Sequence, residues 1–465
     1  MNKLQRLGEV PVPTLLRELS IPAIIGMLVN ALYNVVDRLY IGQGCGRDAI
    51  AGVALSFPFM AILAAFGTLI GVGSGALLSI KLGEKRHAEA EMVVGQCIAV
   101  KTLFFITLPI IILCFLDWFL KTFGATPEAL PYAREYLRII LYGNIFSHLS
   151  FGMANMLRSE GQANRSMHCL VIGAVLNTIL DPIFIFGFKM GVAGAAWATD
   201  LAMLSTAAVA FYFYLSGKTA VRLRWKRVRI FPRVLGRVFA IGLSPFLLQL
   251  MMGGITVAYN RMFLRWAPTT ESATLEIAAM GIIHTLLSLF FMPLMGITQG
   301  MQPIVGYNYG AKDFHRVRSA YALSVKIASL VCLAVTLTIL IFAGPIARCF
   351  TNEPLLLKTT TRDFRLFSCM FFTIGMPVVT VDYYRSIGRA GIAIILSMMR
   401  QGFMLLPLIL LFPILWGVTG IWLAGPVSDL LSSIVTDIVG FRELRKLARL
   451  GPAADSRTPD PAPVE

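Results

Sequence analysis

Charged residues are scarce in this chain of 465 residues. Asp, Glu, Lys and Arg make up 14% of it, whereas soluble domains carry roughly 25%. Hydrophobic residues make up 57%. A membrane span needs roughly 20 predominantly apolar residues, and the chain contains repeated stretches of that length. This composition excludes a soluble globular domain and places most of the chain in a bilayer.

Residues that carry covalent chemistry are also few. The chain has five His and no His-Glu-x-x-His pattern. The run Gly217-Lys218-Thr219 lacks the upstream glycine of a phosphate-binding loop, because Tyr212 occupies that place. We therefore predict that the protein is not an enzyme and needs no cofactor.

The seven Cys residues have neither disulfide nor metal-ligand spacing. Five of them fall inside apolar stretches and are interpreted as packing residues: Cys97, Cys114, Cys169, Cys332 and Cys369. The first 19 residues are polar and contain no short apolar core before a cleavage site, so we expect the N-terminus to be retained.

The apolar stretches predict an all-α integral membrane protein with twelve transmembrane helices. The predicted spans are 20–42, 49–80, 91–117, 137–158, 166–186, 193–216, 239–262, 277–306, 319–347, 364–384, 391–415 and 419–441. They define five expected regions. These are a cytoplasmic N-terminus (1–19), an N-terminal six-helix lobe (20–216), a basic cytoplasmic linker (217–238), a C-terminal six-helix lobe (239–441) and a partly disordered cytoplasmic tail (442–465).

The net charge of +16 is explained by topology. With both termini in the cytoplasm, the inside segments hold most of the Lys and Arg, as the positive-inside rule requires. The link from Lys218 to Arg237 is rich in Lys and Arg and has no acid, so we expect it to touch anionic lipid headgroups. Nucleic acid is not an expected partner, because no recognition motif accompanies the charge.

An internal repeat relates the two lobes. A shift of 227 residues aligns Gly83 with Gly310, Gly161 with Gly388 and Lys85 with Lys312, and a shift of 226 aligns Gly191 with Gly417. Because each lobe has an even number of spans, the repeat is parallel. Duplicated architectures of this kind are typical of secondary transporters, in which one half moves against the other.

Acids inside spans point to a coupling site. A charge at the bilayer centre costs at least about 2.5 kcal/mol, so such acids are often functional. Asn177 and Asp181 are four residues apart and share one face of the fifth span. Their oxygens could hold a hard cation or share a proton. Asp37 lies in the first span with Asn34 one turn earlier, and its aligned partner in the second lobe is Asn260.

Structural interpretations of these acids stay open. Asp37 could pair with Arg38 or reach the outer interface, and Asp181, which precedes Pro182, could cap the end of the fifth span. Asp200 and Asp429 could simply join hydrogen bonds between helices, and Asp382 lies near the inner end of its span beside Arg385.

The chain resembles the multidrug and toxic compound extrusion (MATE) transporters, close to the DinF/MepA-like branch. The resemblance rests on Leu32-Tyr33-Asn34-Val35-Val36-Asp37, on Leu157-Arg158-Ser159-Glu160-Gly161-Gln162 and, most specifically, on the stretch from Asn177 to Gly187 that continues from Gly191 to Thr199. It implies two six-helix bundles around a central cavity and export of organic cations or amphipathic drugs in exchange for H⁺ or Na⁺. In this branch the residues matched by Asp37, Asn177, Asp181 and Thr199 couple the ion, and Pro22 matches a proline at which the first helix bends.

The resemblance predicts a monomeric multidrug antiporter in the cell membrane. Met27, Tyr33 and Asn260 are the residues predicted to line its substrate cavity. The alternative is a lipid or lipid-linked saccharide flippase of the same superfamily, which needs cationic side chains facing the cavity. Four cations within or near spans keep that alternative open: Lys101, Arg261, Lys326 and Arg400. A channel would not need ion-coupled exchange, and a membrane-embedded enzyme would need a catalytic constellation.

Overall fold

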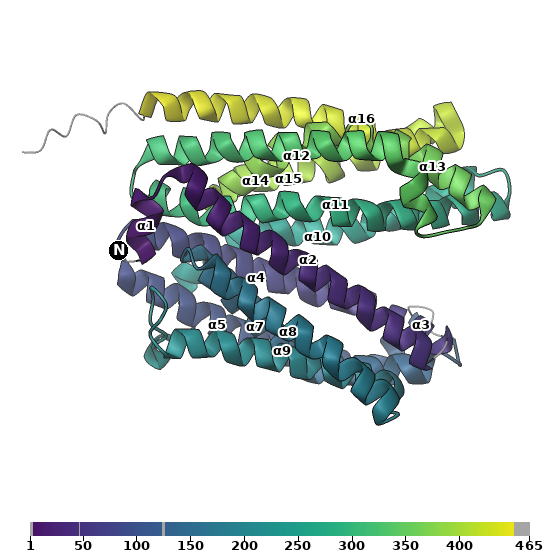
Figure 1. The fold of residues 1–465 in the computed structure, drawn as a ribbon, viewed down its shortest axis with the longest axis horizontal. Helices are drawn as coiled ribbons and strands as arrows, with labels where there is room; N and C mark the ends of the chain where they lie inside the picture. Colours follow the sequence, from purple (N-terminus) through teal and green to yellow (C-terminus); the bar gives the residue numbers. More distant parts are fainter. Residues whose placement is uncertain (1–2, 46, 123–125, 451–465) are drawn as a thin grey trace, which may run out of the picture. The chain divides into compact units, whose positions relative to one another are not determined.

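The computed structural model describes residues 3–45, 47–122 and 126–450, and these residues form helices and short connections without a β-strand. The first helices are α1 (Lys3–Glu9), α2 (Val12–Cys45), α3 (Arg47–Ala54), α4 (Phe57–Gly83), α5 (His87–Cys114), α6 (Leu116–Thr122), α7 (Leu130–Ser159), α8 (Ala163–Pro182), the π-helix η1 (Ile183–Gly187) and α9 (Gly191–Leu215). After the 3₁₀ turn η2 (Trp225–Arg227) come α10 (Pro232–Trp266), α11 (Thr270–Gly310), α12 (Phe314–Arg348), α13 (Pro354–Ser368), η3 (Phe371–Ile374), α14 (Gly375–Ser386), α15 (Ala390–Met398), the π-helix η4 (Met399–Leu405) and α16 (Leu406–Leu450). The all-α prediction is confirmed (Figure 1).

The chain divides into two compact units. One contains Glu18–Leu78 and Arg86–Leu250, and the other contains Met1–Arg17, Ser79–Lys85 and Met251–Glu465. In the first unit α9 packs against α7 and α8, and in the second α12 packs against α11, α13 and α16. Three of the four boundaries between the units fall inside α2, α4 and α10, so these helices each contribute to both units, and the fourth lies in the turn between α4 and α5.

The long helices can be assigned to twelve membrane crossings. Nine helices of the described residues are long and apolar enough to span a bilayer, and the bent pair α13 with η3 and α14 is a tenth. The 30-residue α7, which covers the predicted span 137–158, is not among the nine. The remaining crossing comes from the segment Ala390–Leu450, which contains two predicted spans.

Gly417 divides that last segment into two crossings. Its φ of 55° lies in the left-handed region that favours glycine. A Cβ built on Gly420 would overlap the carbonyl oxygen of Phe412, although residues eight apart in a continuous helix lie about 12 Å apart along its axis. The chain therefore reverses at Gly417, between the predicted spans 391–415 and 419–441.

Backbone conformation repeats between the two halves. Three pairs of residues in the left-handed region occur at the shift found in the sequence: Lys85 (φ 57°) and Lys312 (φ 62°), Gly161 (φ 77°) and Gly388 (φ 75°), Gly191 (φ 58°) and Gly417 (φ 55°). Such conformations are uncommon outside turns, so their recurrence is independent support for a duplicated fold.

Some predicted spans need correction in detail. The span predicted over 49–80 contains a turn at Leu55 and Ser56, between α3 and α4, although Gly52–Gly83 is apolar and long enough to form one crossing. The span predicted over 364–384 is bent by 42° between α13 and η3. Of the Cys residues predicted to pack, Cys97, Cys169 and Cys332 are buried, but Cys114 is exposed and Cys369 is half-buried. Apolar composition does not distinguish a side chain that faces protein from one that faces lipid.

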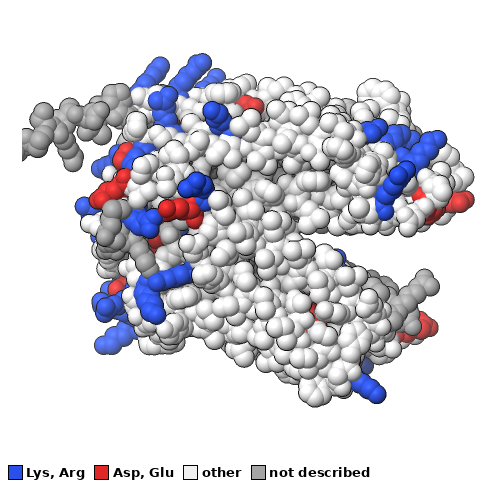
Figure 2. All heavy atoms as spheres, viewed as in Figure 1, with Lys and Arg blue, Asp and Glu red and all other residues white. Residues whose placement is uncertain are grey.

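Charged side chains gather toward the ends of the helices. On the face drawn in Figure 2, the long middle stretches of the helices are almost free of charge. This distribution is the one that a hydrocarbon layer selects, because ionised side chains there are costly.

The basic linker after α9 is anchored by the buried carboxyl group of Glu160. This group accepts hydrogen bonds from the backbone N–H of Ala220 (2.7 Å), the hydroxyl of Tyr214 (3.0 Å) and the side-chain amide of Gln162 (3.1 Å). Burial raises the pKa of Glu160 to about 7, although these hydrogen bonds oppose the shift. Further along, Arg224 pairs with Glu91 on α5 at 3.1 Å. The linker therefore carries a surplus of positive charge and is also held in place by specific contacts with α5 and with the end of α7.

Candidate functional site

The helix α2 carries Asp37 to a half-buried position. The neighbouring Arg38 is exposed, and its guanidinium lies 4.8 Å from the centre of the Phe57 ring. Among the described residues Arg38 makes no ion pair with Asp37. The carboxyl group of Asp37 is attracted by the charge of Arg38 without pairing with it, and it also interacts with Asp181 on α8.

Asn177 and Asp181 on α8 are both fully buried. The side-chain amide of Asn177 donates to Oδ1 of Asp181 (3.1 Å) and to Oγ1 of Thr199 on α9 (3.3 Å). Asp181 does not stand at a free helix end, because α8 continues through Pro182 into the π-helix η1. A π-helix in a span often marks a functional site.

Asp37 and Asp181 lie within hydrogen-bonding reach of each other through their carboxyl groups. Three buried oxygens of this cluster have no hydrogen-bond partner in the described residues, namely Oδ1 of Asp37, Oδ2 of Asp181 and Oδ1 of Asn177. Two ionised carboxylates only accept hydrogen bonds, so their close approach requires a proton or a cation to stabilise it. The arrangement is suited to binding and releasing either.

Two further polar residues adjoin the cluster and were not among the predicted site residues. The hydroxyl of Tyr136 on α7 interacts electrostatically with Asp37, Asp181 and Asp200. Asp200 on α9 is buried against Gly143 of α7, where a Cβ would overlap its carboxyl group. Gly143 therefore allows the carboxyl group to lie against the backbone of α7.

Comparison with known proteins decides the family. The model of the MatE family matches residues 22–183 and 266–411. The chain belongs to the MatE family. The predicted resemblance is confirmed.

Relatives of this MatE chain include the multidrug export protein MepA of Staphylococcus aureus (strain NCTC 8325 / PS 47), which is 25% identical over 433 residues, 93% of this chain and 94% of MepA. The MepA protein of Staphylococcus haemolyticus (strain JCSC1435) is 27% identical over 405 residues, 86% of this chain and 87% of MepA.

Solved structures support the same assignment. A multidrug resistance MATE family transporter in an outward-facing conformation has a TM-score of 0.89 at 26% identity, with 97% of this chain and 99% of that chain covered. A transporter of the MOP superfamily from Pyrococcus furiosus has a TM-score of 0.88 at 26% identity, with 96% and 99% covered. The MatE chain is therefore a multi-span membrane transporter.

The other predicted site residues of the MatE chain are more scattered. Asn34 is exposed, and its amide donates to the backbone oxygen of Asn30 on the same helix (2.6 Å). Tyr33 interacts electrostatically with Asp37 and Asp181. Met27 is half-buried on α2, and Asn260 is half-buried on α10 in the other compact unit. Tyr33 is therefore tied to the carboxyl cluster.

The predicted hinge, Pro22, is buried inside α2, and the helix continues on both sides of it. Proline removes one backbone hydrogen bond from a helix interior. The bend predicted at this residue stays a prediction.

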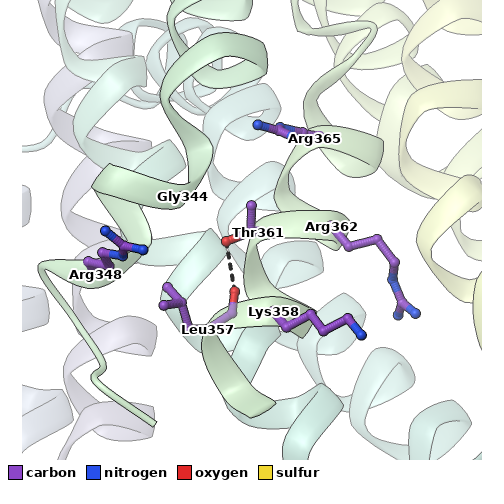
Figure 3. A pocket seen from close by; sticks show the side chains of 7 residues that line it. All are labelled: Gly344, Arg348, Leu357, Lys358, Thr361, Arg362 and Arg365. Atoms are coloured by element: carbon purple, nitrogen blue, oxygen red, sulfur yellow. Dashed lines mark hydrogen bonds between the residues drawn. The ribbon is translucent and has the colours of Figure 1, made fainter. Parts of the chain in front are cut away.

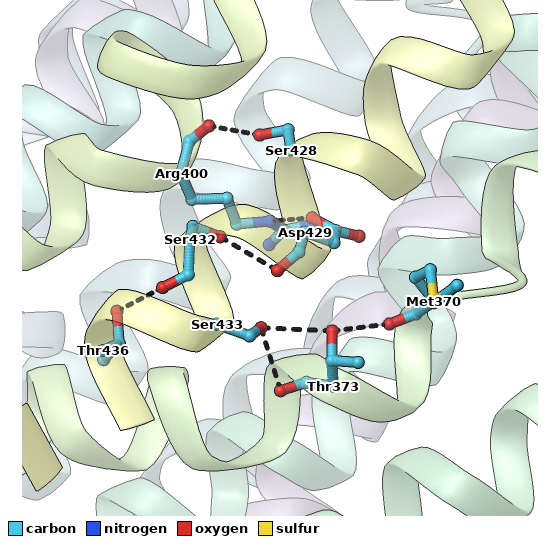
Figure 4. A network of polar contacts seen from close by, with 8 residues as sticks. All are labelled: Met370, Thr373, Arg400, Ser428, Asp429, Ser432, Ser433 and Thr436. Carbon is cyan, nitrogen blue, oxygen red and sulfur yellow. Dashed lines mark hydrogen bonds and ion pairs between the residues drawn. The ribbon is translucent and has the colours of Figure 1, made fainter. Parts of the chain in front are cut away.

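A second polar network lies in the other unit, around Arg400 of η4. Its guanidinium pairs with Oδ1 of Asp429 on α16 at 2.6 Å, and its backbone oxygen accepts from Ser428 at 2.7 Å (Figure 4). One turn on, Ser433 donates to the backbone oxygen of Thr373 (3.1 Å). The sequence suggested hydrogen bonding for Asp429 but did not identify Arg400 as its partner, because the two residues are 29 apart.

Two of the four cations that kept the flippase alternative open have partners within their own unit. Arg400 is neutralised by Asp429. Lys101 is buried, and its ammonium donates to the backbone oxygens of Gly67 (3.2 Å) and His148 (2.8 Å). Arg261 and Lys326 are exposed.

Proposed function

We propose that this MatE transporter is a secondary active exporter that moves organic cations or amphipathic drugs out of the cell in exchange for H⁺ or Na⁺. The names of the MepA relatives support a multidrug substrate range for those proteins. The cell membrane is the proposed location, with both termini in the cytoplasm, and the proposed working form is a monomer.

One observation carries the ion coupling, the pair of carboxyl groups of Asp37 and Asp181 with partnerless buried oxygens. Removing both protons without adding a cation would leave two negative charges side by side in a low-dielectric environment, which is strongly unfavourable. The pair therefore exists with a bound proton or cation, or is separated by movement of α2 relative to α8. Either event links the charge state of the pair to the conformation of the helix.

The residues fit both ions. A proton shared between Asp37 and Asp181 would satisfy one partnerless oxygen on each of them. A Na⁺ ion would be held by oxygens of Asp37, Asp181, Asn177 and Thr199, which are the hard ligands that such a cation prefers. The described residues contain no group of three or more His, Cys, Asp or Glu that could hold a metal ion.

In the proposed cycle the carboxyl group of Asp37 interacts with the drug and with the coupling ion in turn. Ionised Asp37 attracts a cationic drug from the cytoplasmic side, and its neutralisation by H⁺ or Na⁺ removes that attraction and releases the drug outside. Met27, Tyr33 and Asn260 are the proposed cavity residues, because Met and aromatic side chains adapt to different apolar ligands.

The experiment is efflux of a fluorescent organic cation from everted vesicles under an imposed pH gradient and, separately, under a Na⁺ gradient. Exchange driven by one gradient supports the proposal and names the ion. Cation movement that is independent of both gradients contradicts antiport, and no cation movement by the folded protein favours the flippase alternative.

A further inference from the structure

A basic cavity lies where α12 ends and α13 begins. The backbone of α12 departs from helical geometry at Phe342 (φ −106°, ψ 17°), just before Gly344 and Pro345. The cavity has a volume of about 470 Å³, and Gly344 and Thr361 form part of its wall (Figure 3). It is large enough for a small ligand or headgroup.

Four cationic side chains line this cavity, Arg348 from α12 and Lys358, Arg362 and Arg365 from α13. Lys358 and Arg362 are four residues apart, and Arg365 follows three residues later, so the three share one face of α13. Like charges at this spacing repel each other and destabilise the helix slightly. An anion bound among them would relieve that repulsion.

One of the four cations is already neutralised. Arg362 makes two hydrogen bonds to Asp363, from Nε to Oδ1 (2.7 Å) and from Nη2 to Oδ2 (2.9 Å), and Nη2 also lies 3.5 Å from Oε1 of Glu276. Arg348, Lys358 and Arg365 are exposed and make no hydrogen bond or ion pair within the part of the chain that the structure describes. These three supply the surplus positive charge.

The surroundings of the cavity are apolar and exposed. On α12 the side chains of Ile341 and Phe342 are 62% and 52% exposed, and Leu355 at the start of α13 is 56% exposed. In a membrane span, exposed apolar side chains contact lipid chains. The cavity therefore lies at the level where an apolar helix surface changes to a cationic end, which is the level of lipid headgroups.

The position is unusual for positive charge. The predicted topology places the α12–α13 link on the outer side of the membrane, where the positive-inside rule expects few Lys and Arg. A cluster of cations there calls for an explanation other than topology, and Glu276 and Asp363 neutralise Arg362 alone.

We propose that this cavity binds the phosphate group of an anionic phospholipid, with Arg348, Lys358 and Arg365 holding the phosphate oxygens and the acyl chains lying along Ile341 and Phe342. Arginine is suited to phosphate because its planar guanidinium donates two parallel hydrogen bonds. The apolar surroundings favour a lipid over inorganic phosphate, which would gain nothing from them.

The exposed thiol of Cys349, next to Arg348, provides a local reporter. We would label Cys349 with a fluorescent dye in full-length protein carrying Cys45→Ser, Cys114→Ser and Cys369→Ser. Phosphatidylglycerol or phosphatidylcholine with brominated acyl chains would be titrated into the detergent micelles. A dye on Cys114, the exposed thiol that ends α5, with Cys349→Ser, serves as the control for general contact with lipid.

We expect saturable quenching at Cys349 at a lower mole fraction of phosphatidylglycerol than of phosphatidylcholine, with no such preference at Cys114. In the double variant Lys358→Gln/Arg365→Gln, the ratio of the phosphatidylcholine to the phosphatidylglycerol mole fraction at half-maximal quenching should fall about fivefold for each cation removed. The matched variant Arg442→Gln/Arg445→Gln, which removes two exposed cations from the far end of α16, should not.

Equal quenching by the two lipids at Cys349, or a preference that survives in the Lys358→Gln/Arg365→Gln variant, would overturn the proposal. Complete reversal of the quenching by inorganic phosphate would identify free phosphate as the ligand and would equally overturn it. The single variants Lys358→Gln and Arg365→Gln replace the double variant if it unfolds. This test does not involve drug transport, so its result is independent of the proposed antiport.

Discussion

Asn177 donates a hydrogen bond of 3.1 Å to Asp181 one turn further along α8. Its amide also reaches Thr199 on α9. The amide thereby orients one oxygen of Asp181, while the other, Oδ2, is buried without a partner among the described residues and the carboxyl group interacts with Asp37.

Replacing Asn177 should weaken ion coupling. In Asn177→Ala the carboxyl group of Asp181 loses its donor, and losing a hydrogen bond to a charged group costs about 1.5–3 kcal/mol, or about tenfold or more in affinity for the coupling ion. The measurement is the ion concentration that half-saturates drug exchange in vesicles. Thr178→Ala is the matched control, since that hydroxyl donates only to the backbone oxygen of Ala174. Equal shifts in the two variants would argue against the role of Asn177.

Thr199 distinguishes the two coupling ions. Thr199→Val keeps the shape of the side chain and removes the oxygen that a Na⁺ ion would use, whereas a proton shared by Asp37 and Asp181 does not need it. We expect a loss of several-fold in Na⁺-driven exchange and little change in H⁺-driven exchange. Thr206→Val, two turns along α9, controls for the loss of a hydroxyl that bonds only to its own helix.

Gly83 is predicted to be intolerant of a side chain. A Cβ there would overlap the backbone oxygen of Tyr307, and its repeat partner Gly310 approaches the backbone oxygen of Ile80 in the same way. Because backbone atoms cannot swing aside, Gly83→Ala should destabilise the protein by about 1–3 kcal/mol. Thermal unfolding in detergent measures the effect. Gly253→Ala, with open space around its Cβ position, should leave the melting temperature nearly unchanged.

Glu160 should make the docking of the linker dependent on pH. Its pKa rises from 4.5 to about 7 because it is buried, so between these values the docked form holds a proton that the undocked form has lost. The stability of docking is therefore greatest below about pH 4.5, falls as pH rises toward 7 and levels off above it. Hydrogen exchange at the amide of Ala220 reports the change directly, since that N–H donates to Glu160.

Two variants complete the pH measurement. Glu160→Gln mimics the neutral carboxyl group and should make protection of the Ala220 amide nearly independent of pH. Glu89→Gln, an exposed acid of α5, should retain the wild-type profile. A profile for Glu160→Gln that still falls between pH 5 and 7 would show that another group controls docking.

Much of the fold followed from the sequence because the bilayer imposes long apolar segments and because a duplicated chain repeats its turns. Gly191 and Gly417 illustrate the second reason. Both have a positive φ, which glycine adopts readily, so the repeated turn appears in the sequence as two glycines at a fixed separation. The ends of the helices and the breaks within them are harder to predict from the sequence. The break at Ser56 and the bend after Ser368 lie inside apolar stretches, where composition carries no signal.

The candidate site was only partly predictable. The spacing of four predicts that Asn177 and Asp181 share one helix face, and the hydrogen bond between them confirms this. Tyr136 and Asp200 were not assigned to the site, because their proximity depends on how α7 packs against α9. The pair of Arg400 and Asp429 could not be predicted because the two residues are 29 apart in the sequence. Glu160 lies in a recognised motif, but the motif gives no sign of its contacts with the linker. The tail 442–465 is helical to Leu450, and its part after that residue, where disorder is predicted, lies outside the described residues.

Coupling through Asp37 is tested most directly by gradient-driven efflux of a fluorescent organic cation by Asp37→Asn in everted vesicles. The control is Asp437→Asn, a half-buried acid in the other unit. We expect Asp37→Asn to abolish exchange driven by the H⁺ or Na⁺ gradient while the protein remains folded, and Asp437→Asn to retain it. Exchange by Asp37→Asn at the wild-type rate, with the same dependence on the gradient, would contradict coupling through the Asp37 and Asp181 pair.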